Sequence, residues 1–198
     1  IDLNRNFIPF DRPLPANPAY ELLDPLLLPP HWPPTAEDEV RREAQAQRLG
    51  PRAYQAAVSS GQYRVPDGLF YGGQAPAWSN RRFRELLRRH VAGRRHVAWI
   101  DIHTGLGPRG VGERIFAVAG GTAKDESRAR RWWGEALTSV DTGTSTSIPL
   151  NGPIQYALPE EAPGVRQTNI CLEFGTLPQA QMHHALCADH WLHRQRGA

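Results

Sequence analysis

The 198-residue chain is short of lysine and of long apolar runs, and both shortages exclude classes of partner. Lys124 is the only lysine, the net charge is +3, and the other basic residues are arginines. The densest basic run, residues 81–89, has the pattern of the solvated side of a helix and not of a basic, aromatic-rich nucleic-acid surface. No apolar run approaches the roughly 18 residues that a membrane span needs. We therefore expect neither a nucleic-acid nor a membrane partner.

Cysteine is also scarce, which excludes a disulfide-rich scaffold and a Cys-x-x-Cys metal site. Cys171 lies in an apolar, strand-like run and is predicted to be a buried thiol. Cys187 lies four residues after His183, so the two share a face of a predicted helix. The pair could bind a metal, or it could belong to an amphipathic helix that packs against the core. We favour the second interpretation. Unpaired thiols favour a reducing compartment, so we predict a cytoplasmic protein.

Strand-like and helix-like segments alternate along the chain, which predicts an α/β sandwich with a largely parallel or mixed sheet. The proportions of apolar residues (40%) and charged residues (22%) are those of a globular protein. Three apolar runs are predicted strands, and the first of them has the pattern of a strand covered on both faces. A short strand is predicted over 68–76. The main strands are 96–105, 114–121 and 167–176. We predict one domain over residues 1–198.

Helix signals separate these strands, and two long stretches carry none. Thr35 is a predicted N-cap for a helix to Leu49, Pro51 can begin the next, and Ser79 caps a third. The proline-rich stretch 8–34 is predicted to be irregular, as is 140–166. The remaining predicted helices are 125–139 and 178–193.

Polar side chains follow the two most apolar strands, at the edge where α/β sheets bind ligands. Asp101 and His103 alternate along the first strand and share one face, and Glu173 closes the second. Taken singly, each residue could be structural: a hydrogen-bonded histidine, or a glutamate that caps a helix or forms an ion pair. A third polar group, Asn4 and Arg5, lies in IDLNRNF at the beginning of the chain. Such a dense cluster suits the middle of a domain, so we expect residues 1–198 to be its carboxyl-terminal portion.

Three motifs together resemble the zinc carboxypeptidases of the carboxypeptidase A type. They are DLNRNF (2–7), IDIHTG (100–105) and LEFGT (172–176), in the order and rough spacing of that superfamily. The tract YGGQAPAWSN (71–80) is similar, more narrowly, to a bacterial branch of it. Aspartoacylase and succinylglutamate desuccinylase share much of this plan. The resemblance implies a three-layer α/β sandwich and a zinc-dependent metallopeptidase.

The resemblance also implies roles for individual residues. Asn4 and Arg5 resemble the pair that holds the terminal carboxylate of the substrate, a task that suits a guanidinium fork. His103 resembles a zinc ligand. Glu173 resembles the general base, which takes a proton from zinc-bound water and passes it to the leaving amine.

Two further residues have predicted supporting roles. Tyr156 is placed like the mobile tyrosine that closes over substrate, although a packed loop tyrosine fits equally well. Asp101 could orient His103 from behind, as ligand imidazoles usually require, or could be a structural carboxylate.

The chain departs from the superfamily at the metal. A catalytic zinc needs three protein ligands, and the His-x-x-Glu motif that supplies two of them lies upstream of the Asn–Arg pair in these enzymes. No such motif precedes Asn4 here, and a further, oxyanion-stabilising arginine is also expected upstream. Arg109 is a possible substitute for that arginine. We expect the 198-residue chain alone to be inactive and poorly stable, with an unpaired sheet edge.

Three functions remain open from the sequence. The first is hydrolysis of an amide bond next to a free carboxylate, on a peptide substrate. The second keeps zinc and acts on an N-acyl amino acid. The third is a non-catalytic domain that binds carboxylates.

Overall fold

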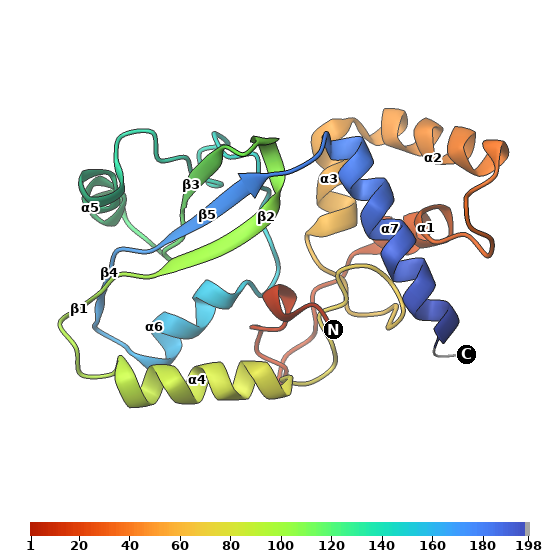
Figure 1. The fold of residues 1–198 in the computed structure, drawn as a ribbon. Helices are drawn as coiled ribbons and strands as arrows, with labels where there is room; N and C mark the ends of the chain where they lie inside the picture. Colours follow the sequence, from red (N-terminus) through yellow and green to blue (C-terminus); the bar gives the residue numbers. More distant parts are fainter. Residues whose placement is uncertain (197–198) are drawn as a thin grey trace. The chain divides into compact units, whose positions relative to one another are not determined.

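The computed structural model describes residues 1–196, which group into two compact units (Figure 1). The helical unit comprises residues 1–77 and 148–153 and the chain from His183 onward. The sheet unit comprises residues 78–147 and 154–182. That the whole chain forms one domain stays a prediction.

The sheet unit contains a mixed three-stranded sheet in the order β2–β5–β3, which confirms the α/β class. β2 (Ile100–Arg109) is parallel to β5 (Ile170–Gly175), and β3 (Gly112–Phe116) is antiparallel to it. The short strands β1 (His96–Val97) and β4 (Arg166–Gln167) also pair in parallel. Hydrogen bonds from Thr168 N to Val97 O and from Ile170 N to Trp99 O, both 3.0 Å, continue this ladder into β2 and β5. The two apolar runs therefore lie side by side in the sheet unit.

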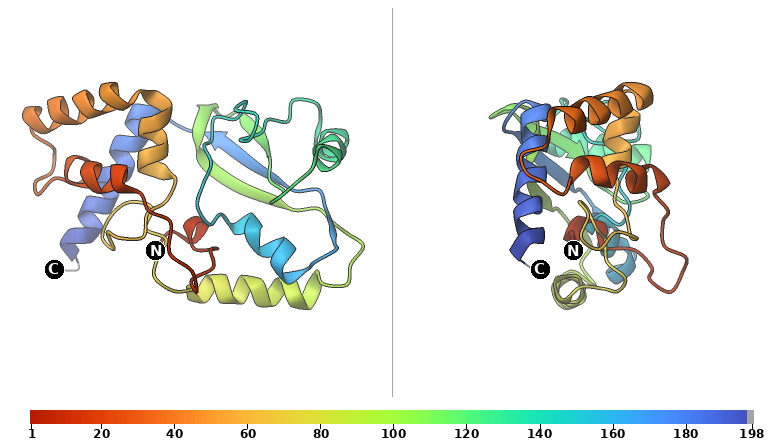
Figure 2. Two further views of the ribbon diagram at one scale, coloured as in Figure 1. Left: turned by 180° about the vertical axis from the view of Figure 1, so that it is seen from behind. Right: turned by 90° about the vertical axis from the view of Figure 1, so that its right-hand side faces the viewer.

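The sheet unit also contains helices, two of which pack against each other. α4 (Trp78–His90) lies beside α6 (Ala157–Glu161), and Arg84 of α4 binds Glu160 and Glu161 of α6 at 2.5 and 2.9 Å (Figure 2). The 3₁₀ helix η2 (Ile154–Tyr156) leads into α6. α5 (Ala123–Trp133) contacts β3, and its buried Ala129 packs with Leu137 and Ile170.

The helix predicted over 125–139 is shorter at its C-terminus and begins earlier. Thr122 caps α5 in a capping box with Asp125, so the helix begins at Ala123. It ends at Trp133 because Gly134 adopts a φ of +99°, a conformation that does not continue a helix.

One face of β2 is open, whereas we predicted a strand covered on both faces. Ile102 is 70% exposed and Ile100 is 44% exposed, while Asp101 and His103 on the other face are half-buried. Within residues 1–196, β5 is the one strand hydrogen-bonded to β2. The apolar run therefore predicted the strand correctly, but the prediction that both of its faces are covered is wrong.

The helical unit is built on four helices and one short turn. These are the 3₁₀ helix η1 (Leu3–Arg5), α1 (Pro18–Leu27), α2 (Ala36–Leu49), α3 (Pro51–Ser59) and α7 (Gln179–Arg196), whose first turn belongs to the sheet unit. Their core contains buried leucines of α1, Ala57 and Val58 of α3, and Cys187 of α7. All helices within residues 1–196 lack the combined length and apolarity of a membrane span.

Two predictions in the helical unit are wrong. The stretch 8–34 contains α1, because Asn17 accepts a hydrogen bond from Tyr20 N at 3.0 Å and Pro18 occupies the first helical position, where proline costs no hydrogen bond. The tract 68–76 forms no strand and contributes one isolated bridge, Gln62 to Tyr71. Glycines at 72 and 73 leave too few side chains there to support a ladder.

His183 of α7 is half-buried, and its Nε2 atom is buried without a hydrogen bond from any described residue. Its ring packs edge-on against Tyr54 of α3, with the ring centroids 6.2 Å apart. Burial, aided by the charge of Arg42, lowers the pKa of His183 from 6.5 to about 4. The folded protein therefore holds a neutral imidazole that the unfolded chain would protonate below pH 6.5.

Replacing His183 by phenylalanine should stabilise the fold, and more so in acid. At His183 the folded state binds fewer protons than the unfolded state, so this residue alone lowers the stability by about 3 kcal/mol from pH 6.5 to pH 4. His183→Phe removes this loss and also about 1 kcal/mol of unsatisfied polar burial. Urea unfolding at several pH values measures both effects. The exposed neighbour His184 provides the control, and an unchanged acid loss in His183→Phe would contradict the assignment.

Candidate functional site

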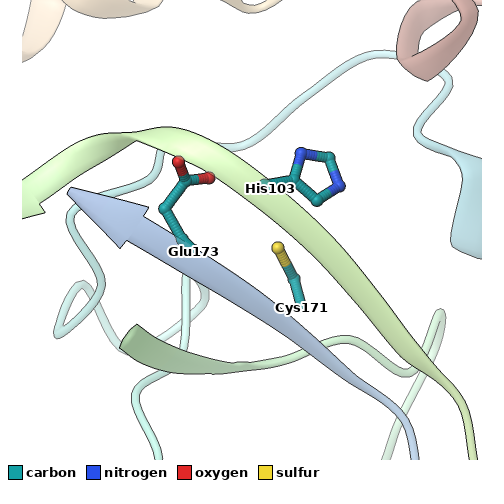
Figure 3. A group of neighbouring side chains, drawn as sticks. All are labelled: His103, Cys171 and Glu173. Atoms are coloured by element: carbon teal, nitrogen blue, oxygen red, sulfur yellow. The ribbon is translucent and has the colours of Figure 1, made fainter. Parts of the chain in front are cut away.

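Four side chains form a square on one face of the sheet, where β2 and β5 run in parallel. The register pairs Asp101 with Cys171 and His103 with Glu173. Alternate residues of a strand share a face, and directly paired residues of neighbouring strands lie side by side. Figure 3 shows His103, Cys171 and Glu173 projecting from these two strands. One ligand atom from each of these three lies within 4.8 Å of the others.

His103 is held by the carboxylate beside it on β2. Its Nε2 atom lies 2.8 Å from Asp101 Oδ2. The hydrogen bond that His103 donates to Asp101, with a second to the Cys171 sulfur, raises the pKa of His103 to about 10 against the opposing effect of burial. The contact that we predicted between Asp101 and His103 is therefore present, and its functional role stays a prediction.

Glu173 is the most enclosed acid of the square, with 8% of its surface exposed. Its Oε1 atom accepts a hydrogen bond from Leu106 N at 3.0 Å. Burial raises the pKa of Glu173, and the nearby Glu113 and Asp101 raise it further, whereas Leu106 N–H and His103 lower it. A carboxyl group with a raised pKa holds a proton more readily than an exposed one, which suits a group that both accepts and returns a proton.

Sequence reasoning missed two members of this neighbourhood. Cys171 was predicted to be a buried thiol, and it is half-buried beside His103, with its pKa raised by burial. The available signal was its position two residues before Glu173, which places both on one face. Glu113 is paired with Glu173 across the antiparallel β3–β5 ladder, and no pattern in one strand alone gives that register.

Glu113 is a second carboxylate held by hydroxyl and amide donors. It accepts from Thr138 Oγ1 at 2.5 Å, from Thr146 N at 3.1 Å and from the Thr146 hydroxyl. Burial raises its pKa, but these hydrogen bonds outweigh burial and the pKa is lowered overall. An ionised Glu113 therefore stands next to Glu173 and favours the protonated form of the latter.

Asn4 and Arg5 belong to the helical unit, where Arg5 is 5% exposed. The Arg5 guanidinium donates to Ser59 O from Nε at 3.0 Å and from Nη2 at 2.5 Å, and to Asn4 O from Nη1 at 2.9 Å. It also lies 5.1 Å from the centre of the Phe70 ring. Burial lowers the pKa of Arg5, partly offset by Asp2. Internal acceptors thus already hold much of this guanidinium, and its substrate role stays a prediction.

The structure brings together three of the six predicted site residues, which are Asp101, His103 and Glu173. Tyr156 lies in η2 of the same unit with 40% of its surface exposed, and no hydrogen bond joins it to the square among residues 1–196. Its role as a mobile cover remains a prediction.

The donor atoms of the square fit a zinc ion in kind. Imidazole nitrogen, thiolate sulfur and carboxylate oxygen are the ligand types of Zn²⁺ in proteins. Ligand atoms of a tetrahedral zinc lie about 3 to 4 Å apart, so a spread of up to 4.8 Å is slightly wider than a closed site. Within residues 1–196, His183 and Cys187 form no metal-capable group of three. Cys171 therefore adds a candidate donor beside His103, the one ligand predicted from the sequence.

Comparison with known proteins gives a family and no individual relative. A family model described as "Protein of unknown function (DUF2817)" matches residues 1–198. Neither the curated proteins nor the solved structures contain a significant match. The match to the family model covers the whole chain, so the chain belongs to the DUF2817 family.

Proposed function

We propose that this chain carries catalytic residues of a zinc-dependent hydrolase that cleaves an amide bond next to a free carboxylate. The observation that supports it most is the meeting of His103, Cys171 and Glu173 at the carboxyl ends of two parallel strands. The motif resemblance to zinc carboxypeptidases points to the same chemistry.

Each residue has a distinct task in this proposal. His103 binds the metal through its imidazole, and Asp101 fixes the orientation of that ring. Glu173 takes a proton from the attacking water and delivers it to the leaving amine. Zinc, when bound, supplies Lewis-acid activation of the water and the scissile carbonyl. The hydrogen bond from Leu106 N keeps the Glu173 carboxylate in place during both transfers.

Asn4 and Arg5 remain candidates for holding the terminal carboxylate. The hydrogen bonds of Arg5 use one N–H of each terminal nitrogen, and each of these nitrogens carries a second N–H. Charge-assisted, bidentate contact with a carboxylate needs only two such groups.

Zinc dependence tests this proposal directly. The protein that contains this chain is stripped of metal with a chelator and reloaded, and zinc content is measured together with hydrolysis. Peptides with a free C-terminus and acyl-aspartate or acyl-glutamate are assayed side by side. We expect hydrolysis that disappears with the metal and returns with zinc. Binding of these compounds without any turnover would reject the hydrolase and favour a carboxylate-binding domain.

A further inference from the structure

An open pocket of about 600 Å³ lies in the sheet unit, at the carboxyl ends of β2 and β5. Its wall consists of the last residues of β2, from Gly105 to Arg109, together with Thr146, residues 176–179 and Gln181. This volume lies in the range of small-molecule sites in proteins. The pocket is therefore large enough for an amino-acid derivative or the end of a peptide.

The charge of this wall is positive. Arg109 is the one charged residue that lines the pocket, and no aspartate or glutamate does. Its side chain is exposed and forms no hydrogen bond or ion pair with any residue from 1 to 196. The other polar lining groups are hydroxyls and amides, from Thr176, Gln179 and Gln181, which can also donate hydrogen bonds.

Two carboxylates of the sheet unit accept hydrogen bonds from residues that line the pocket. Glu173 accepts from the backbone of Leu106, and Glu113 accepts from the backbone and hydroxyl of Thr146. Both Leu106 and Thr146 line the pocket. The two acids therefore do not pair with Arg109, whose guanidinium is left for an anion from outside.

The pocket adjoins the residues assigned to catalysis. Only Thr104 and Gly105 separate His103 from Leu106, and Leu106 N is 3.0 Å from Glu173 Oε1. A Cβ atom at Gly105 would lie 3.6 Å from the same carboxylate oxygen. Gly105 and Leu106, which line the pocket, thus also contact the Glu173 carboxylate.

We propose that Arg109 anchors a carboxylate of the substrate in this pocket. The guanidinium fork matches a carboxylate in shape and charge, and the remaining lining groups add hydrogen bonds. The inference deepens the proposed function, on which it rests, because it names the residue and the pocket that hold the free carboxylate of the substrate. The bound carboxylate is either the terminal one or that of an acidic side chain.

Binding of small probes to the metal-free protein that contains this chain tests this assignment. N-acetylglycine carries only a terminal carboxylate, N-acetylglutamate α-amide carries only a side-chain carboxylate, and N-acetylglutamine α-amide carries neither. We expect at least one acid to bind about tenfold or more tightly than the neutral amide by calorimetry. Whichever acid binds identifies the source of the carboxylate.

Arg109→Gln should remove this preference and weaken the acid about tenfold or more. Arg109→Lys, which keeps the charge but loses the fork, should fall between the two. Arg131→Gln is the matched control, because Arg131 is an exposed arginine of α5 that does not line the pocket. Circular dichroism of each variant verifies that it is folded.

Equal binding of acid and amide, equal binding by Arg109→Gln, or no binding of either acid would overturn the assignment. These results are independent of zinc and of turnover. Selective acid binding without zinc-dependent hydrolysis would reject the proposed function but support Arg109 as the carboxylate anchor. Zinc-dependent hydrolysis with unchanged acid affinity in Arg109→Gln would support the proposed function but reject Arg109 as the anchor.

Discussion

Replacing Glu173 by glutamine should lower kcat by about a thousandfold while zinc remains bound. General acid–base catalysis contributes about 10² to 10⁴ in rate, and an amide cannot take a proton from water. The substitution is close to isosteric. The amide oxygen of glutamine can still accept the hydrogen bond from Leu106 N, so the loop that lines the pocket keeps its anchor. The expected loss therefore reports proton transfer and not a change in structure.

The measurement combines steady-state kinetics with zinc analysis of the same sample. Glu135→Gln is the matched control, because Glu135 is an exposed glutamate of the same unit. Its kcat should remain within twofold of the parent value, as roughly expected for a surface change. Full activity in Glu173→Gln would remove the assigned base. Loss of zinc in that variant would instead make Glu173 a metal ligand, with the donor set His103, Cys171 and Glu173.

The parts of this site that follow from single strands were predictable. In each of the two strands a short apolar run leads into polar residues, which is typical of a buried strand that ends at a site. Period-two alternation then places Asp101 with His103 and Cys171 with Glu173. The sequence therefore predicts which two side chains of each strand share a face.

The pairing between the two strands was not predictable from the sequence. It depends on how far β2 is shifted along β5, and a shift of one residue would turn the two side chains of one strand to the opposite face. Cys171 and Glu113 gain their meaning from register alone, since they lie beside Asp101 and Glu173 only in the folded sheet. Local patterns do not encode that pairing.

Arg5 shows a second limit of sequence reasoning. The motif DLNRNF identifies a guanidinium but not the acceptors that will surround it. In the structure the carbonyl of Ser59, far away in the sequence, takes two of its hydrogen bonds. Arg109, in contrast, has no such partner among residues 1–196, although nothing in GLGPRG distinguishes it from the other arginines of the chain.

Gly175→Ala should destabilise the sheet unit by more than about 3 kcal/mol, because steric overlap with fixed backbone is among the most damaging single changes. Gly175 ends β5, and two separated residues of β2, Gly105 and Arg109, both pair with it. The intervening loop places the carbonyl oxygens of Gly107 and Pro108 directly over its α-carbon, where an added Cβ would overlap both. The loop therefore requires glycine at this position.

Neither side of this contact can move away easily. Gly175 O accepts from Gly110 N at 2.9 Å, and Gly175 N donates to Val111 O at 3.3 Å. These bonds hold the end of β5 against the turn between β2 and β3. Relief of the overlap would require the loop from Leu106 to Pro108 to lift, which would also stretch the hydrogen bond from Leu106 N to Glu173. Loss of stability and loss of the pocket should then occur together.

Gly93→Ala separates this effect from an ordinary glycine substitution. Gly93 lies in the same unit with a φ of +79°, and a methyl group on its α-carbon would meet no heavy atom within 4 Å, so alanine there costs only backbone strain of about 1 kcal/mol. Urea unfolding of both variants gives the comparison, and the acid probes described for Arg109 report the pocket. Equal losses in the two variants would show that the loop yields to a methyl group. In that case the loop from Leu106 to Pro108 can move, and the fold would no longer fix the position of the pocket relative to Glu173.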